Sequence, residues 1–173
     1  MANPIDFARM SLKDALDLAI LVEEEAAERY EELAEQMETH HSPDAAGFFR
    51  MMIQYERKHG DELSGRRRAL FGESERSVDR SMLWDVEAPS YDRVEMFMSA
   101  RDALLVALDS ERKAHQFFVE SIEHCADLEV RALFEELREE EVHHQELVKQ
   151  ELENLPESRG PAAANYSDDP VAQ

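Results

Sequence analysis

The sequence predicts an all-α protein, an antiparallel four-helix bundle in which two helical hairpins are joined by a long crossover. Apolar residues recur every three or four positions over long stretches, which is the period of a helix with one buried face. The chain has only 5 Gly and 6 Pro among 173 residues, too little turn material for a fold with many strands. The two halves also repeat one pattern. We expect one domain over residues 1–155 and an extended or disordered tail over 156–173.

The first predicted hairpin begins at Ser11, because Ser11 and Asp14 have the spacing of a capping box. The inner face of this helix carries Leu12, Leu16, Ala19, Ala26, Tyr30, Leu33 and Met37. Ser42 is the expected N-cap of the second helix, with Pro43 at the first helical position. This second helix is expected to end at about Phe71. Its inner face carries Phe49, Met52, Ile53, Leu63 and Leu70.

The second predicted hairpin follows a crossover over residues 72–90, where the helical pattern stops. Its first helix is expected from about Tyr91 to His124, and its second from an Asp127 cap to about Leu155. Nineteen extended residues reach about 60 Å at ~3.3 Å each, whereas a helix of ~28 residues is only about 42 Å long. The crossover can therefore run the length of the bundle, which allows the second and third helices to be parallel.

The charge balance is strongly acidic, with 40 acidic and 19 basic residues and a formal net charge of −21. Such a chain repels nucleic acid and anionic membranes and attracts cations. A single cysteine, Cys125, excludes an internal disulfide framework and any site with four cysteine ligands. No run of about 18 apolar residues predicts a membrane span, and the first nine residues do not form a signal peptide. We expect a cytoplasmic protein.

Each predicted hairpin carries one Glu on its first helix and a Glu-x-x-His pair on its second. The set is Glu23, Glu56, His59, Glu111, Glu141 and His144. Glu23 lies on the apolar face, because it follows Ala19 by four residues and precedes Ala26 by three. Burying one unpaired carboxylate costs several kcal/mol, so four require cations or protons. The pattern is that of the di-iron carboxylate proteins, in which the ligands project into a bundle core.

On these motifs the sequence resembles the ferritin-like superfamily, and within it the rubrerythrin-type di-iron domain, over residues 11 to about 152. The motifs are EEEAAERY at 23–30, ERKH at 56–59, ERKA at 111–114 and EVHH at 141–144. The resemblance implies two iron ions held by the six residues named above, with Glu56 and Glu141 as bridging carboxylates. A Mn/Fe pair or Zn would use the same ligand set.

The resemblance has two departures. Rubrerythrins proper carry a further Glu three residues after the ligand on the third helix, where this chain has Ala114. The chain also lacks a Cys-rich rubredoxin domain, so the electron donor is expected to be external. A homodimer or larger homo-oligomer is implied by the resemblance, and the long crossover permits an exchange of hairpins between two chains.

Two assignments remain open in the sequence. Glu140 with His143 has the same spacing as Glu141 with His144; we favour the second pair, because the apolar residues before it repeat the spacing found before Glu56. Tyr30 lies two turns from Glu23 on the same face. It is a candidate catalytic residue, as a hydrogen-bond donor to a ligand or an electron relay, and equally a core tyrosine with a satisfied hydroxyl.

Three functions are compatible with these features. The first is an oxidoreductase that reduces H2O2 or O2 at a di-iron site in oxidative-stress defence, with Glu23, Glu56, Glu111 and Glu141 at the reacting centre. The second is a ferroxidase that binds and stores iron. The third is a metal-free helical interaction module, whose stability would not respond to iron.

Overall fold

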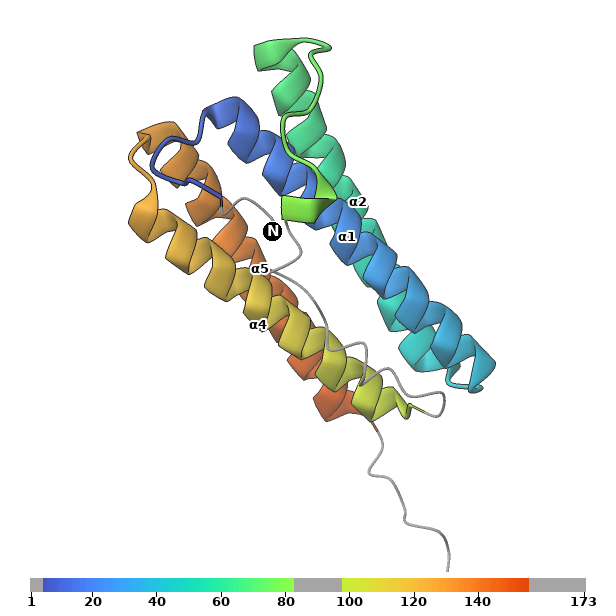
Figure 1. Cartoon of the computed structure of the whole chain (residues 1–173). Helices are drawn as coiled ribbons and strands as arrows, with labels where there is room; N and C mark the ends of the chain where they lie inside the picture. The colour runs from blue at the N-terminus through green and yellow to red at the C-terminus, as the bar shows by residue number, and fades with distance from the viewer. Residues whose placement is uncertain (1–4, 83–97, 156–173) are drawn as a thin grey trace, which may run out of the picture.

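Four long helices and one short 3₁₀ helix make up the described part of the chain. A computed structural model describes residues 5–82 and 98–155. The elements are α1 (Leu12–Thr39), α2 (Pro43–Phe71), η1 (Arg80–Met82), α4 (Ala100–His124) and α5 (Leu128–Asn154). α1 pairs with α2 and α4 with α5 in two antiparallel hairpins, and α2 runs in the same direction as α4 (Figure 1). The predicted all-α bundle is confirmed. Among the described helices, none has the length and apolar character needed to cross a membrane.

The predicted helix boundaries at Ser11, Pro43 and Asp127 are confirmed. The Ser11 hydroxyl accepts a hydrogen bond from the backbone N–H of Asp14 at 3.2 Å, and the Asp14 carboxylate accepts one from the Ser11 N–H at 3.3 Å. The Asp127 carboxylate caps α5 through two backbone N–H groups. Gly72 ends α2 with φ 66°, in the left-handed region that glycine adopts without strain.

The predicted start of the third helix at Tyr91 is not where α4 begins. α4 begins at Ala100, and Ser99 with Asp102 forms a complete capping box before it. The Ser99 N–H and hydroxyl both donate to the Asp102 carboxylate, at 3.2 and 2.5 Å. The extended backbone of Ser99 stops the helix from continuing toward the N-terminus. Residues 83–97, and the predicted tail at 156–173, lie outside the described residues.

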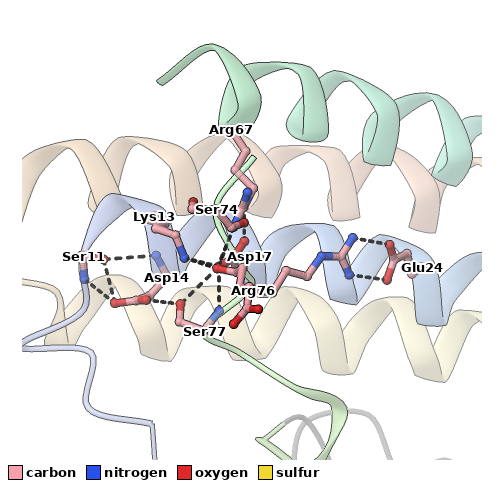
Figure 2. A network of polar contacts seen from close by, with 10 residues as sticks. Ser11, Lys13, Asp14, Asp17, Glu24, Arg67, Ser74, Arg76 and Ser77 are labelled. Atoms are coloured by element: carbon pink, nitrogen blue, oxygen red, sulfur yellow. Dashed lines mark hydrogen bonds and ion pairs between the residues drawn. The ribbon is translucent and has the colours of Figure 1, made fainter. Parts of the chain in front are cut away.

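The described start of the crossover is held against α1 by charged side chains (Figure 2). Asp17 of α1 is fully buried, and it accepts hydrogen bonds from the Arg67 guanidinium of α2 and, at 3.0 Å, from the backbone N–H of Ser77. Farther along, Arg76 forms a two-pronged pair with Glu24 at 2.9 and 2.7 Å. These contacts connect α1, α2 and the crossover at one end of the first hairpin.

The prediction that Leu70 lies on the inner face of α2 is wrong. Leu70 is 55% exposed, whereas Arg67, three residues earlier, is buried. Because Arg67 reaches Asp17, the inner face of this last turn of α2 is occupied by a charged side chain. The turn is therefore fixed by ion pairing, and Leu70 faces away.

The buried apolar side chains form two clusters, one toward each end of the bundle. The first cluster includes Leu16, Leu18, Phe118, Leu133 and Phe134. The second cluster includes Met37, Phe49, Met52, Leu104 and Val148. Every long helix contributes to both clusters, and each leaves a polar stretch between its two contributions. This middle section of the bundle is where the candidate ligands lie.

Candidate metal centre

The six predicted ligands come together in the middle section, between the two apolar clusters. The four Glu side chains and His144 are buried, and His59 is partly buried. α1 supplies Glu23, α2 supplies Glu56 and His59, α4 supplies Glu111, and α5 supplies Glu141 and His144. Their positions follow from the helical period, which keeps residues three and four apart on one face. Both hairpins of a single chain thus contribute to one site.

An inner group consists of Glu111, Glu141 and His144, which are all buried and each offer one ligand atom within 4.8 Å of the others. His144 Nδ1 lies 3.5 Å from Glu111 Oε2. Two donor atoms that bind one ion at about 2.1 Å each are at most about 4.2 Å apart. The His144–Glu111 distance is therefore compatible with a shared ion.

An outer group consists of Glu23, His59 and Glu140, which also offer ligand atoms within 4.8 Å of one another. His59 Nδ1 lies 4.0 Å from Glu23 Oε2 and 3.6 Å from Glu140 Oε2. Glu56 lies between the inner and outer groups, since it forms a third group with His59 and His144, and its Oε1 is 3.2 Å from His144 Nδ1. The arrangement offers places for two ions with Glu56 between them.

The two imidazole rings show that these groups fit a cation. The rings of His59 and His144 are stacked, with centroids 5.5 Å apart and an interplanar angle of 10°. Within the described residues, His59 Nδ1 and both ring nitrogens of His144 are buried without a hydrogen bond. Buried polar atoms in proteins are almost always hydrogen-bonded, and a neutral imidazole nitrogen is a common metal ligand. Orphaned nitrogens beside buried carboxylates match the needs of a divalent ion.

Comparison with known proteins identifies the family. A model of the rubrerythrin family matches residues 14–152. The chain belongs to the rubrerythrin family. A crystal structure of an uncharacterized conserved protein from Magnetospirillum magnetotacticum MS-1 is 34% identical, with a TM-score of 0.69 over 85% of this chain and 97% of that chain. A search of curated proteins found no match.

Membership in the rubrerythrin family implies a di-iron protein, and the carboxylate and His groups are candidate ligands for the metal. Burial shows which of the two Glu-x-x-His pairs, Glu140 with His143 or Glu141 with His144, faces the core. Glu141 and His144 are buried, whereas His143 is exposed and Glu140 is partly exposed beside His59. Binding of metal by the six residues stays a prediction.

The proximity of Glu140 to His59 is a feature that the helical pattern did not predict. Glu140 precedes the inward Glu141 by one residue, and neighbouring residues on a helix point about 100° apart. Glu140 therefore lies at the edge of the buried face, three residues after the buried Leu137. The signal in the sequence was that spacing from Leu137, but only the packing of α5 against α2 brings the side chain to His59.

The buried carboxylates of this rubrerythrin-family site have strongly shifted pKa values. Burial, with the Glu140 and Glu111 carboxylates nearby, raises the pKa of Glu23 to about 7. Burial and the adjacent Glu111 raise the pKa of Glu141 well above its usual value. Burial alone would raise the pKa of Glu111, but the neighbouring His144 imidazole, the Glu141 carboxyl and the Tyr30 hydroxyl hold it below the ordinary 4.5. The metal-free site therefore retains protons, which bound cations would displace.

Tyr30 connects the two hairpins at the inner group. Its hydroxyl, on α1, donates a hydrogen bond to Glu111 Oε1 on α4. The ring is buried and lies 5.9 Å from that of Phe49, centroid to centroid. Gln145, which the sequence did not single out, donates to the backbone carbonyl of Glu111 at 3.4 Å. Glu111 thus has one carboxylate oxygen held by Tyr30, while the other lies toward His144.

Two openings lead from the surface toward the site. A cavity of about 180 Å³ between α2 and α5 is lined by His59 and Glu140 together with Glu62, Arg66 and Glu136. A second cavity, of about 400 Å³ between α1 and α2, reaches Glu23 and Glu56 and is rimmed by Glu24, Glu28 and Glu31. Small molecules and ions therefore have routes to the outer group and to the central Glu56.

Proposed function

We propose that the chain is a non-haem di-iron oxidoreductase that reduces H2O2, or O2, with electrons from an external donor in defence against oxidative stress. The observation that carries the proposal is the pair of carboxylate–His groups with Glu56 between them. Membership in the rubrerythrin family also supports the proposal. So do the two cavities, which are large enough for substrates of two oxygen atoms.

Two iron ions at this site would supply the two electrons that convert H2O2, with two protons, into two molecules of water. The chain itself has three tasks. The inner and outer groups hold the ions, and the apolar clusters on either side limit the approach of water. The Tyr30 hydroxyl fixes the Glu111 carboxylate by binding Oε1, so that Oε2 stays directed toward His144.

The test begins with anaerobic titration of Fe²⁺ into the metal-free protein, followed by rapid mixing with H2O2 or O2 while absorbance is recorded. We expect about two irons per chain, the count for such bundles, and faster oxidation by H2O2 than by O2. Repeated turnover should then require an added reductant. The proposal fails if the chain binds no stoichiometric iron and Glu56→Ala is indistinguishable from the parent.

A ferroxidase that binds and stores iron is the second candidate, favoured by the formal net charge of −21 of the chain. Negative potential around a protein concentrates cations. Faster oxidation by O2, with uptake of iron beyond two ions per chain, would select this function over H2O2 reduction. A metal-free interaction module predicts a melting temperature that does not change when iron is added.

A further inference from the structure

We propose that Glu140 is a seventh metal ligand, which binds the same ion as Glu23 and His59. This inference rests on the proposed function, because it concerns an ion of the same centre. It adds to the six residues of the repeated motif a carboxylate whose own Glu-x-x-His partner, His143, is exposed. The added residue makes the outer group a site with donors from three helices, α1, α2 and α5.

The distances support this role. Glu140 Oε2 is 3.6 Å from His59 Nδ1, closer than the 4.0 Å between His59 Nδ1 and Glu23 Oε2. Both distances lie below the limit of about 4.2 Å for two atoms that share one ion. The His59 nitrogen is buried without a hydrogen bond among the described residues, although two carboxylates lie beside it. An ion between these atoms would give that nitrogen a bonding partner.

The number of donors also favours Glu140. The resemblance implies that Glu141 bridges both ions, but in the structure Glu141 lies only in the inner group, with Glu111 and His144, and in neither group that contains His59. Without Glu140 the outer group would have only Glu23 and His59, besides the central Glu56. α4 supplies no substitute, because the buried residue one turn after Glu111 is Ala114, which has no donor atom. With Glu140, the two groups have equal numbers of donors.

The other acids of the α2–α5 cavity are engaged elsewhere. Glu136 pairs with Arg66 at 3.2 Å, and Glu62 pairs with Lys58 at 3.7 Å. Glu140 instead contacts an imidazole. Its side chain is 38% exposed and lines the cavity that reaches His59. A carboxylate in this place can bind an ion while it remains accessible to solvent, which distinguishes the outer group from the fully buried inner group.

The test uses Co²⁺ as the probe, because its visible absorption reports the coordination of each ion. Metal-free parent, Glu140→Gln and Glu136→Gln proteins are titrated anaerobically by calorimetry and by absorbance. Glu136→Gln is the matched control, since it removes the same charge from the same cavity without touching the outer group. Far-ultraviolet circular dichroism of the metal-free variants verifies that each one is folded.

We expect two Co²⁺ per chain in the parent and in Glu136→Gln. In Glu140→Gln we expect the Co²⁺ affinity of one site to be unchanged and that of the other to fall by at least about tenfold, with an altered absorption spectrum. Tenfold is the lower end of the loss that follows removal of a residue that only supports a ligand. If Glu140→Gln matches the parent, or if both variants weaken binding equally, Glu140 is not a ligand. If the parent itself binds no Co²⁺ and no Fe²⁺, the proposed function fails instead.

Discussion

At the scale of single residues, the Tyr30 hydroxyl links the two hairpins by donating from α1 to Glu111 on α4. Tyr30→Phe removes this donor and keeps the ring, as at the matching position Phe118, which is fully buried. A hydrogen bond to a charged group contributes about 1.5–3 kcal/mol, so the metal-free variant should unfold at lower urea concentration. Because Glu111 loses its orientation, Fe²⁺ affinity should also fall by about 10–100-fold.

Tyr55→Phe is the control for that change. Tyr55 lies near His144, with ring centroids 6.5 Å apart, but its hydroxyl is not the one that binds Glu111. Urea unfolding and anaerobic Fe²⁺ titration of both variants should show a loss for Tyr30→Phe alone. Unchanged iron affinity in Tyr30→Phe would mean that the hydroxyl is only part of the packing.

At the scale of elements, the start of α4 depends on the Ser99 capping box. Ser99→Ala should lower the free energy of unfolding by about 1 kcal/mol, the usual cost of losing an N-cap side chain. Ser42→Ala is the matched control, because the Ser42 side chain makes no capping hydrogen bond to α2. Equal effects of the two substitutions in urea unfolding would contradict a specific role for the Ser99 box.

The junction of α1, α2 and the crossover depends on Asp17. Asp17→Asn leaves the buried Arg67 guanidinium without its counter-charge, which typically costs about 3–5 kcal/mol. Glu24→Gln, which breaks only the exposed pair with Arg76, should cost no more than about 1 kcal/mol. Urea unfolding measures both values, and a similar small loss in the two variants would show that the junction contributes little.

The same junction gives the protein an acid-sensitive component of stability. Burial alone would raise the pKa of Asp17, but hydrogen bonds from Arg67, Ser77 and Lys13 lower it below the ordinary 3.8. A lowered pKa in the folded state means that this contribution is complete above about pH 4 and is lost as the pH falls through the folded-state pKa. In urea unfolding between pH 5 and pH 2.5, Asp17→Asn should lose less stability than the parent.

At the scale of the whole molecule, the metal-free protein should become less stable as the pH rises from 5 to 8. Glu23 has a folded-state pKa raised from 4.5 to about 7, so the folded state binds more protons in this range, and their loss at higher pH removes stability. Added Fe²⁺ should stabilise most at high pH, where Glu23 has already lost its proton and no longer has to release it to the metal. Thermal melts of parent and Glu23→Gln, with chelator or under anaerobic Fe²⁺, measure both trends. A chelator-treated parent with the same pH profile as Glu23→Gln would contradict this assignment.

Much of this architecture could be predicted from the spacing of residues, because helical period and capping are local. Ser11, Pro43 and Asp127 mark helix starts through their own neighbours. Ser99 with Asp102 repeats the Ser11 box, but the residues before Ser99 show no clear break in the sequence, so the pattern places the helix start too early. The orientation of Leu70 depends on the contact between Arg67 and Asp17 of α1. The orientation of Glu140 depends on His59 of α2. The rotation of each helix about its axis decides such contacts, and periodicity alone does not fix it.

The separation of the apolar side chains into two clusters has a consequence for how the protein acquires metal. Each cluster draws side chains from both hairpins, so the two ends of the bundle are closed independently of the polar section between them. We therefore expect the chain to fold before any ion binds. Ions should enter the polar middle section through small local movements, while the two apolar clusters remain packed. Metal would then bind to a protein that has already folded, and a chelator would remove the metal without unfolding the chain.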